Sequence, residues 1–147
     1  MQTSGLHHIT AITKDVQKNV DFYEGFLGQR FVKKTVNFDD PRSYHLYYGD
    51  YVGSPGTTLT FFSWSHLPKR QPGWGEASAW SYRIPPDSSL HWMLRASAFS
   101  VPVEEVVVHG ERALLFSGPD DHQVYLIESE STTNPPLHFW NDGPVPR

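Results

Sequence analysis

Two adjacent histidines, His7 and His8, lead directly into a run of apolar and β-branched residues. Histidine can act as an acid, a base or a metal ligand near neutral pH. Because side chains alternate across a strand, His8 should share one face with Thr10 and Ile12. If that face lines a cavity, His8 and Thr10 reach into it together. The ordinary alternative is that the histidine pair belongs to a surface or to a core.

Length and composition describe a small globular protein. The 147 residues suffice for one compact unit or for two small repeats that share a core. Hydrophobic residues make up 38% of the chain, and no apolar run approaches the roughly 20 residues that span a membrane. The net charge of -4, without a basic stripe, argues against a nucleic-acid partner. Without cysteine or a signal pattern, the chain is expected to be cytoplasmic.

Aromatic residues are the unusual part of the composition. They make up 14% of the chain, which also contains eight histidines. Such a composition suits a lined pocket or a large interface, and equally an aromatic core.

The first half of the chain predicts five elements in the order β-α-β-β-β. Apolar residues spaced for one helical face follow Asp15, with Thr13 or Asp15 as the cap and Gly28 just past the end. Runs rich in β-branched and aromatic residues, separated by Gly, Pro and Asp, predict the strands. The expected strands are 5–13, 29–38, 44–48 and 57–62.

The same order is expected again after a connector rich in Pro and Gly. Asp87 is the expected cap of the second helix, at 88–98. The expected strands are 77–84, 101–108, 111–116 and 122–127. This is a degenerate internal duplication, so we predict an α+β fold of two tandem βαβββ modules. The expected division is a first module at 1–64, a linker at 65–76, a second module at 77–129 and an extended tail at 130–147.

This arrangement resembles the vicinal oxygen chelate superfamily, which includes glyoxalase I, bleomycin-resistance proteins and extradiol dioxygenases. Several motifs in order are similar to the amino-terminal half of the hydroquinone-type ring-cleaving dioxygenases. These motifs are Gly5-Leu6-His7-His8-Ile9-Thr10, Asp21-Phe22-Tyr23, Leu27-Gly28, the stretch 30–39, Tyr44-His45-Leu46-Tyr47-Tyr48-Gly49-Asp50 and the stretch 55–64. The resemblance implies a curved mixed sheet that encloses a bowl-shaped site.

The resemblance also implies a metal site. These enzymes hold one Fe(II), or sometimes Mn(II), with two histidines and one carboxylate, leaving positions open for an aromatic substrate and O2. His8 matches the ligand on the first strand, and the second His and the Glu come from the carboxy-terminal half. His7 and Thr10 match catalytic neighbours that line the site and bind substrate or orient the ligand.

The other ligands of the superfamily have no match in this sequence. The position of a ligating His in the second module is taken by Ala79 or a neighbour, and the positions of a closing Glu by Thr60 and Tyr125. The chain therefore supplies one expected ligand of three. His45, on a central strand, either lines the bowl or packs in the core, and we predict that Tyr44, His45 and Thr60 bind substrate.

The remaining titratable residues carry weaker expectations. We expect His91 at the surface of the second helix and His109 in a hairpin turn. His122 begins the last strand and can reach the rim of the bowl, and Glu128 should be solvated. None of these residues has a recognisable metal-ligand spacing.

Four hypotheses follow. The favoured one is a half-size subunit of a non-haem Fe(II) dioxygenase that cleaves hydroquinones or catechols and needs a separate carboxy-terminal-half chain, or another copy, to complete its site. A second is a metal-free binding or resistance protein of the same fold. A third is a glyoxalase-like homodimeric metalloenzyme, and the fourth is a non-functional remnant that keeps the fold.

Overall fold

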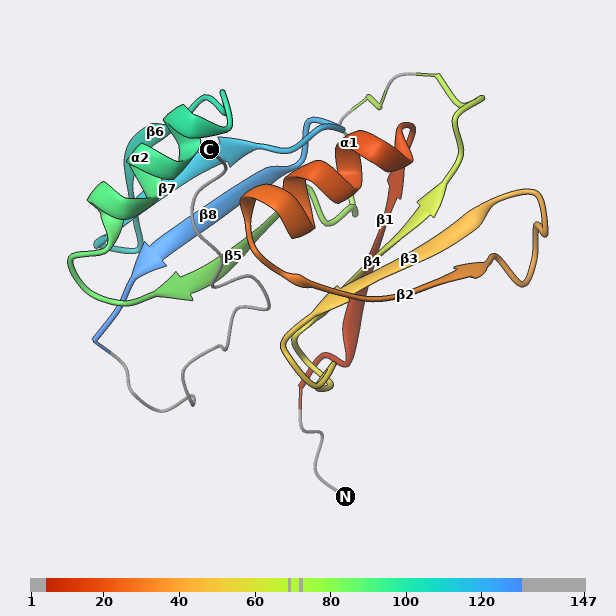
Figure 1. The fold of residues 1–147 in the computed structure, drawn as a ribbon, viewed down its shortest axis with the longest axis horizontal. Helices are drawn as coiled ribbons and strands as arrows, with labels where there is room; N and C mark the ends of the chain where they lie inside the picture. Colours follow the sequence, from red (N-terminus) through yellow and green to blue (C-terminus); the bar gives the residue numbers. More distant parts are fainter. Residues whose placement is uncertain (1–4, 69, 72, 131–147) are drawn as a thin grey trace. The chain divides into compact units, whose positions relative to one another are not determined.

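The same order of elements occurs twice along the chain (Figure 1). The structure, a computed structural model, describes residues 5–68, 70–71 and 73–130, so residues 131–147 of the expected tail lie outside it. The first module contains β1 (His8–Thr13), α1 (Val16–Val20), the π-helical segment η1 (Asp21–Phe26), β2 (Arg30–Val36), β3 (Tyr44–Gly49) and β4 (Thr58–Ser63). The second contains β5 (Ala79–Ile84), α2 (Ser89–Ala98), β6 (Glu104–Val108), β7 (Glu111–Ser117) and β8 (Gln123–Glu128).

Each module forms its own four-stranded mixed sheet. The strand orders are β1-β4-β3-β2 and β5-β8-β7-β6, and the described residues fall into two compact units that divide between residues 69 and 70. In both sheets the first strand pairs in parallel with the last, and the other pairs are antiparallel. The predicted α+β fold of two repeated βαβββ modules is confirmed.

The first helix begins where the sequence predicts. Asp15 caps it, because its carboxylate accepts hydrogen bonds from the backbone N–H groups of Gln17 and Lys18 at 3.1 Å each. The helix then departs from the expected regular form: η1 replaces α-helical geometry after Val20. Gly25, a weak helix former, lies inside this π-helical segment.

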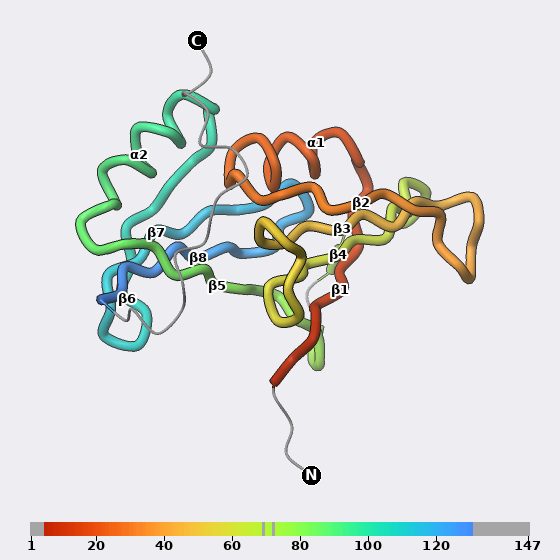
Figure 2. The backbone as a smooth tube through the Cα atoms, turned by 60° about the horizontal axis from the view of Figure 1, so that its bottom comes forward, coloured from red at the N-terminus to blue at the C-terminus, as the bar shows by residue number. Residues whose placement is uncertain are grey.

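The π-helical geometry turns a cluster of aromatic residues toward the sheet. Phe22, Tyr23 and Phe26 are all buried, and the Tyr23 ring lies 5.3 Å from the Tyr48 ring and 4.8 Å from the Phe61 ring, centroid to centroid. The core of the first module therefore lies between η1 and one face of the sheet, as Figure 2 shows for the helix above β2, β3 and β4.

The second helix is capped differently from our expectation. Ser88, not Asp87, is the N-cap residue, and its side chain makes no capping bond. Asp87 instead has a φ of 59°, a left-handed conformation outside the helix. Glu128 replaces it: its Oε1 accepts hydrogen bonds from Ser89 N at 2.9 Å and from Ser89 Oγ at 2.7 Å. Glu128, predicted to be solvated, is half-exposed at the end of β8, and its carboxylate also satisfies the start of α2.

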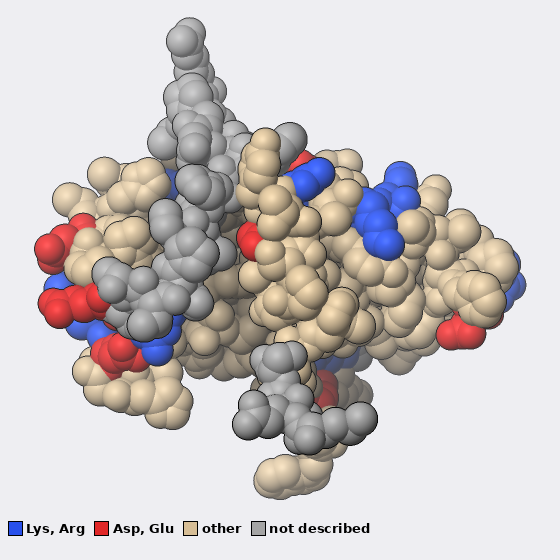
Figure 3. Space-filling model, turned by 90° about the horizontal axis from the view of Figure 1, so that it is seen from below, with Lys and Arg blue, Asp and Glu red and all other residues tan. Residues whose placement is uncertain are grey.

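Two surface properties bear on function. No helix in the described part of the chain is both long and apolar enough to cross a membrane. On the face seen in Figure 3, Lys and Arg side chains are interspersed with Asp and Glu, and they form no continuous basic stripe there.

Candidate metal and substrate site

One face of the first sheet collects the predicted site residues. Along β1 the exposed positions alternate, so His8, Thr10 and Ile12 share a face, as predicted. The strand register extends this face across the sheet, because directly paired residues point to the same side. We call it the histidine face, and its members are His8, Thr10 and Ile12 of β1, Thr58, Thr60 and Phe62 of β4, His45 and Tyr47 of β3, and Lys33 and Thr35 of β2.

The two leading histidines contact each other at the start of this face. Their Nδ1 atoms lie 3.0 Å apart, and their rings meet edge to face. His8 is exposed, and its Nε2 has no hydrogen-bond partner among the described residues. When His8 Nδ1 donates to His7 Nδ1, the Nε2 atom keeps its lone pair for a metal ion. His7 can thus fix the tautomer of His8 that a metal ligand needs.

Thr10 and Thr60 form a hydrogen-bonded pair beside His8. They are direct partners in the parallel β1–β4 ladder, and the Thr60 hydroxyl donates to the Thr10 hydroxyl at 2.9 Å. Thr60 is fully buried, whereas Thr10 is exposed. Thr10 therefore presents its hydroxyl at the surface in an orientation that Thr60 helps to set.

His45 lies in the centre of the same face. Its ring lies between those of Tyr47 and Phe62, at centroid distances of 4.1 and 4.2 Å. Its Nδ1 is 2.8 Å from the Tyr47 hydroxyl, while its Nε2 is buried without a hydrogen-bond partner in the described structure. Burial lowers the pKa of His45, and the positive charges of His8 and Lys33 lower this pKa further. His45 is therefore neutral at pH 7.

A β-bulge brings a lysine onto the histidine face. Phe31 pairs with Tyr48, but the next pair along is Lys33 with Tyr47, so β2 contains one extra residue here. Lys33 therefore faces the same side as Tyr47, and its ammonium lies 4.3 Å from the centre of the Tyr47 ring.

Tyr44 does not join the other predicted substrate-binding residues. It pairs with Val36 one position before His45, so it lies on the opposite face, where the Lys34 ammonium sits 4.5 Å from the centre of its ring. The structure thus brings His8, Thr10, Thr60 and His45 to one face and leaves Tyr44 on the other. Period-two alternation already separates Tyr44 from its neighbour His45.

The second module holds other residues at the matching positions. By register, Ala79 corresponds to His8, Ser81 to Thr10 and Tyr125 to Thr60. Within residues 5–68, 70–71 and 73–130, no group of three or more His, Cys, Asp or Glu side chains could hold a metal ion. The donors therefore fit a metal site in part: His8 suits one corner, and the described residues supply no complete set of ligands.

The other histidines are placed apart from this face. His91 is exposed on α2, and His109 occupies the turn between β6 and β7 with a φ of 52°. His122 precedes β8, is buried and lies 5.0 Å from the Trp80 ring, centroid to centroid. Each therefore has a position set by its own module, and none extends the donor set of His8.

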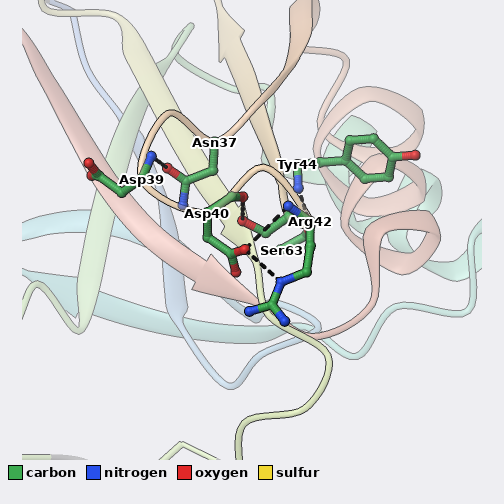
Figure 4. A network of polar contacts seen from close by, with 7 residues as sticks. Asn37, Asp39, Asp40, Arg42, Tyr44 and Ser63 are labelled. Atoms are coloured by element: carbon green, nitrogen blue, oxygen red, sulfur yellow. Dashed lines mark hydrogen bonds and ion pairs between the residues drawn. The ribbon is translucent and has the colours of Figure 1, made fainter.

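A hollow of about 270 Å³ lies elsewhere in the first module, near the β2–β3 turn. Its lining is Asp40, Arg42, Ser43, Ser63, Trp64, Ser65 and His66. Figure 4 shows that Arg42 is held by Asp40, whose Oδ1 accepts bonds from Arg42 Nε at 3.1 Å and Arg42 N at 3.2 Å. These contacts with Arg42 hold the pKa of Asp40 below its ordinary value. The local charges thus neutralise each other, and we place the candidate site on the histidine face instead.

Sequence reasoning missed two residues of the histidine face. Tyr47 was not singled out although it is two positions from His45, the spacing that shares a face. Lys33 was not singled out either, and its position depends on the bulge between Phe31 and Lys33. No residue in that stretch signals a bulge, so the sequence alone contained no sign of this placement.

Comparison with known proteins agrees with this fold. The family described as the Glyoxalase/Bleomycin resistance protein/Dioxygenase superfamily matches residues 5–140. MhqO of Bacillus subtilis (strain 168), named as a ring-cleaving dioxygenase, is 43% identical over 144 residues, which cover 98% of this chain and 45% of MhqO. A chlorohydroquinone/hydroquinone 1,2-dioxygenase of Sphingobium indicum is 37% identical, over 99% of this chain and 46% of its own length.

Similarity to a solved structure extends to the arrangement of the backbone. A crystal structure from Bacillus subtilis subsp. subtilis str. 168, described as that of a dioxygenase, superposes with a TM-score of 0.80 at 44% identity. The match covers 88% of this chain and 42% of that one, so the chain spans less than half the length of this protein and of the two curated relatives above. The chain belongs to the Glyoxalase/Bleomycin resistance protein/Dioxygenase superfamily.

Proposed function

We propose that this chain forms one half of a non-haem Fe(II) dioxygenase that cleaves the ring of hydroquinone- or catechol-like aromatics with O2. The observation that carries the proposal is the exposed His8 imidazole on a face lined by hydroxyl and aromatic side chains. Relatives named as ring-cleaving dioxygenases support the reaction class, and the hydroquinone dioxygenase supports the substrate class.

The predicted site residues on and beside this face have proposed roles. His8 binds the metal through Nε2, and His7 orients it through the 3.0 Å contact between their Nδ1 atoms. Thr10, held by Thr60, places a hydroxyl beside the metal position to bind or orient the substrate. His45 contacts the substrate from the middle of the sheet. The iron, or Mn(II) in its place, would act as a Lewis acid and hold the aromatic substrate and O2 in neighbouring positions.

Completion of the site requires ligands from outside the described residues. We propose that a second histidine and a glutamate come from a carboxy-terminal-half chain in a cytoplasmic assembly. The lengths of the relatives support this proposal, because the matched region covers only 45% and 46% of two of them.

The test is the metal content and ring-cleaving activity of the reconstituted assembly. We expect His8→Ala to abolish Fe(II) binding and hydroquinone cleavage, because one of three protein ligands is lost. His91→Ala, which removes an exposed histidine on α2, is the matched control and should leave both unchanged. Ring cleavage at the unaltered rate in the His8→Ala assembly would contradict the proposal.

The alternative is a metal-free protein that binds or sequesters small aromatic molecules. Ala79 and Tyr125 at the matching positions of the second module favour it, because neither binds iron as His and Glu do. Stoichiometric Fe(II) in the assembly, lost in His8→Ala, rules this alternative out. Aromatic binding without metal in any combination of chains would establish it instead.

A further inference from the structure

The unpartnered nitrogen of His45 determines which ring nitrogen carries the proton. A neutral imidazole has one N–H donor and one acceptor. Its Nδ1 contacts the Tyr47 hydroxyl at 2.8 Å, whereas Nε2 is buried without a partner among the described residues. A buried N–H without an acceptor is rarer and costlier than an unpaired lone pair. We therefore assign the proton to Nδ1 and the lone pair to Nε2.

This tautomer sets the direction of the bond to Tyr47. His45 Nδ1–H donates to the Tyr47 oxygen, so the phenol proton of Tyr47 must point elsewhere. A hydroxyl that accepts one hydrogen bond becomes a stronger donor in the next, because the two bonds polarise each other. The Phe62 ring, 4.2 Å from that of His45, holds the imidazole from the other side. Tyr47 is thus a hydroxyl donor held in place by His45.

The strand register gives this donor polar neighbours across the whole sheet. Thr10 pairs with Thr60, Thr60 with Tyr47, and Tyr47 with Lys33. The row contains three hydroxyl groups and ends in an ammonium that lies 4.3 Å from the centre of the Tyr47 ring. Donors and a positive charge in one row favour a ligand oxygen that carries negative charge.

We propose that Tyr47 and Lys33 form an oxyanion seat that binds an ionised phenolic oxygen of the aromatic ligand, with His45 as the positioning residue for the Tyr47 hydroxyl. The ligand's other ring oxygen lies toward β1 and His8. This inference rests on the proposed function for the choice of an aromatic ligand. In this arrangement the ring binds as a phenolate, and Lys33 of β2 and Tyr47 of β3 select for the ionised form.

The first experiment reads the tautomer of His45 by 15N NMR of the whole chain, freed of metal with a chelator. We expect the proton on Nδ1 at pH 7.5. In Tyr47→Phe the acceptor oxygen is gone, and the proton should move to Nε2, whereas Tyr44→Phe should leave it on Nδ1. A proton on Nε2 in the unaltered protein overturns the inference, because Tyr47 would then donate to His45 and not to the ligand.

The second experiment measures phenolate binding with a matched pair of probes. 4-Nitrophenol ionises near neutral pH and its anion absorbs visible light, whereas 4-nitroanisole is its methyl ether and cannot ionise. We expect the metal-free chain to bind the phenolate about tenfold more tightly than the ether, the effect of one hydrogen bond to a charged group. Tyr47→Phe and Lys33→Met should each remove most of this preference.

The opposite face supplies the controls. Tyr44 and Lys34 form the same kind of cation–π pair on the other face of the sheet, with the Lys34 ammonium 4.5 Å from the centre of the Tyr44 ring. Tyr44→Phe and Lys34→Met should therefore keep the preference for the phenolate. Three results would each overturn the proposed seat. They are equal affinity for the two probes, binding of neither probe, and an equal loss of the phenolate preference in the variants and in their controls.

The metal test separates this inference from the proposed function. His8→Ala should keep the phenolate preference and lose Fe(II) binding. Loss of the preference in Tyr47→Phe and Lys33→Met depends on neither iron nor the partner chain. A phenolate preference without Fe(II) binding in the assembly contradicts only the dioxygenase, and Fe(II) binding without the preference contradicts only the seat.

Discussion

The two modules share a backbone plan but differ in the side chains that occupy matching positions. In the first module the row across the sheet reads Thr10, Thr60, Tyr47 and Lys33. In the second it reads Ser81, Tyr125, Leu115 and Glu104. A lysine is thus matched by a glutamate, a tyrosine by a leucine, and His8 by Ala79. The first row contains three hydroxyl groups and an ammonium, whereas the second contains two hydroxyl groups and a carboxylate, so topology alone does not locate a site.

The faces of the two sheets that the helices cover are more alike. The aromatic side chain of the pair lies on the last strand in the first module and on the first strand in the second. In the first module Phe61 lies opposite Ala11, and in the second Leu126 lies opposite Tyr82. Both Phe61 and Leu126 are buried. Both modules thus bury apolar side chains on one face of the sheet, while the other face differs in charge and hydrogen bonding.

The largest expected effect tests this equivalence of the cores. Phe61→Ala should lower the free energy of unfolding by about 3–5 kcal/mol and Leu126→Ala by about 2–5 kcal/mol, because each leaves a cavity. Urea unfolding monitored by circular dichroism measures both. Val107→Ala, at a side chain 73% exposed, is the control and should stay within about 0.5 kcal/mol. A loss below about 1 kcal/mol in either core variant would show that the two cores are not equivalent.

The helix caps provide a second, smaller contrast. Asp15 caps α1 from the adjacent residue, whereas Glu128 satisfies Ser89 at the start of α2 from the last strand. Asp15→Ala should cost about 1 kcal/mol, and Glu128→Ala about 1–3 kcal/mol because a buried donor loses a charged acceptor. Asp87→Asn should change stability by less than about 0.5 kcal/mol, since Asn tolerates its left-handed backbone. A larger loss for Asp87→Asn than for Glu128→Ala would restore Asp87 as the cap.

These caps show how far the sequence could predict the fold. Strand alternation and the turn residues between strands are local signals, and Asp15 acts within three residues, so the modules and the first cap could be predicted. Glu128 acts across 39 residues. That Glu128 and not Asp87 satisfies the start of α2 depends on how β8 ends beside this helix. The π-helical segment buries three aromatic side chains together, a feature of packing that periodicity does not contain.

The site was predictable to a similar extent. Alternation placed His8, Thr10 and Ile12 on one face, and the structure confirms this sharing. Their roles, and those of His7, Thr60 and His45, stay predictions. Lys33 could not be assigned, because a bulge of one residue reverses the face of every later side chain on β2. The placement of His8 on the first strand is thus a local feature, whereas the placement of Lys33 is set by pairing across the sheet.

The smallest expected effect concerns the pH dependence of stability. His45 of the first module is half-buried, and His122 of the second is buried. Burial lowers the pKa of His45, as do the charges of His8 and Lys33. Burial also lowers the pKa of His122, helped by Arg70 and opposed by Asp120, Glu76 and Asp121. Both histidines are therefore neutral when folded, and the unfolded chain, with histidine near its ordinary pKa of 6.5, binds more protons as the pH falls.

The contribution of these two histidines to the free energy of unfolding is therefore complete above about pH 6.5. It is lost as the pH falls through their folded pKa values. Urea midpoints at pH 7.5 and pH 5.5 should show a fall in the unaltered chain and a smaller fall in His45→Gln and in His122→Gln. His91→Gln, at an exposed position, should match the unaltered chain. If His45→Gln retained the full fall, the fold would not lower the pKa of His45, and His45 would be charged in the folded protein at pH 5.5. A charged imidazole would still donate to Tyr47 from Nδ1, but it would also carry a proton on the buried Nε2, so the burial cost that assigns the lone pair to Nε2 would be small.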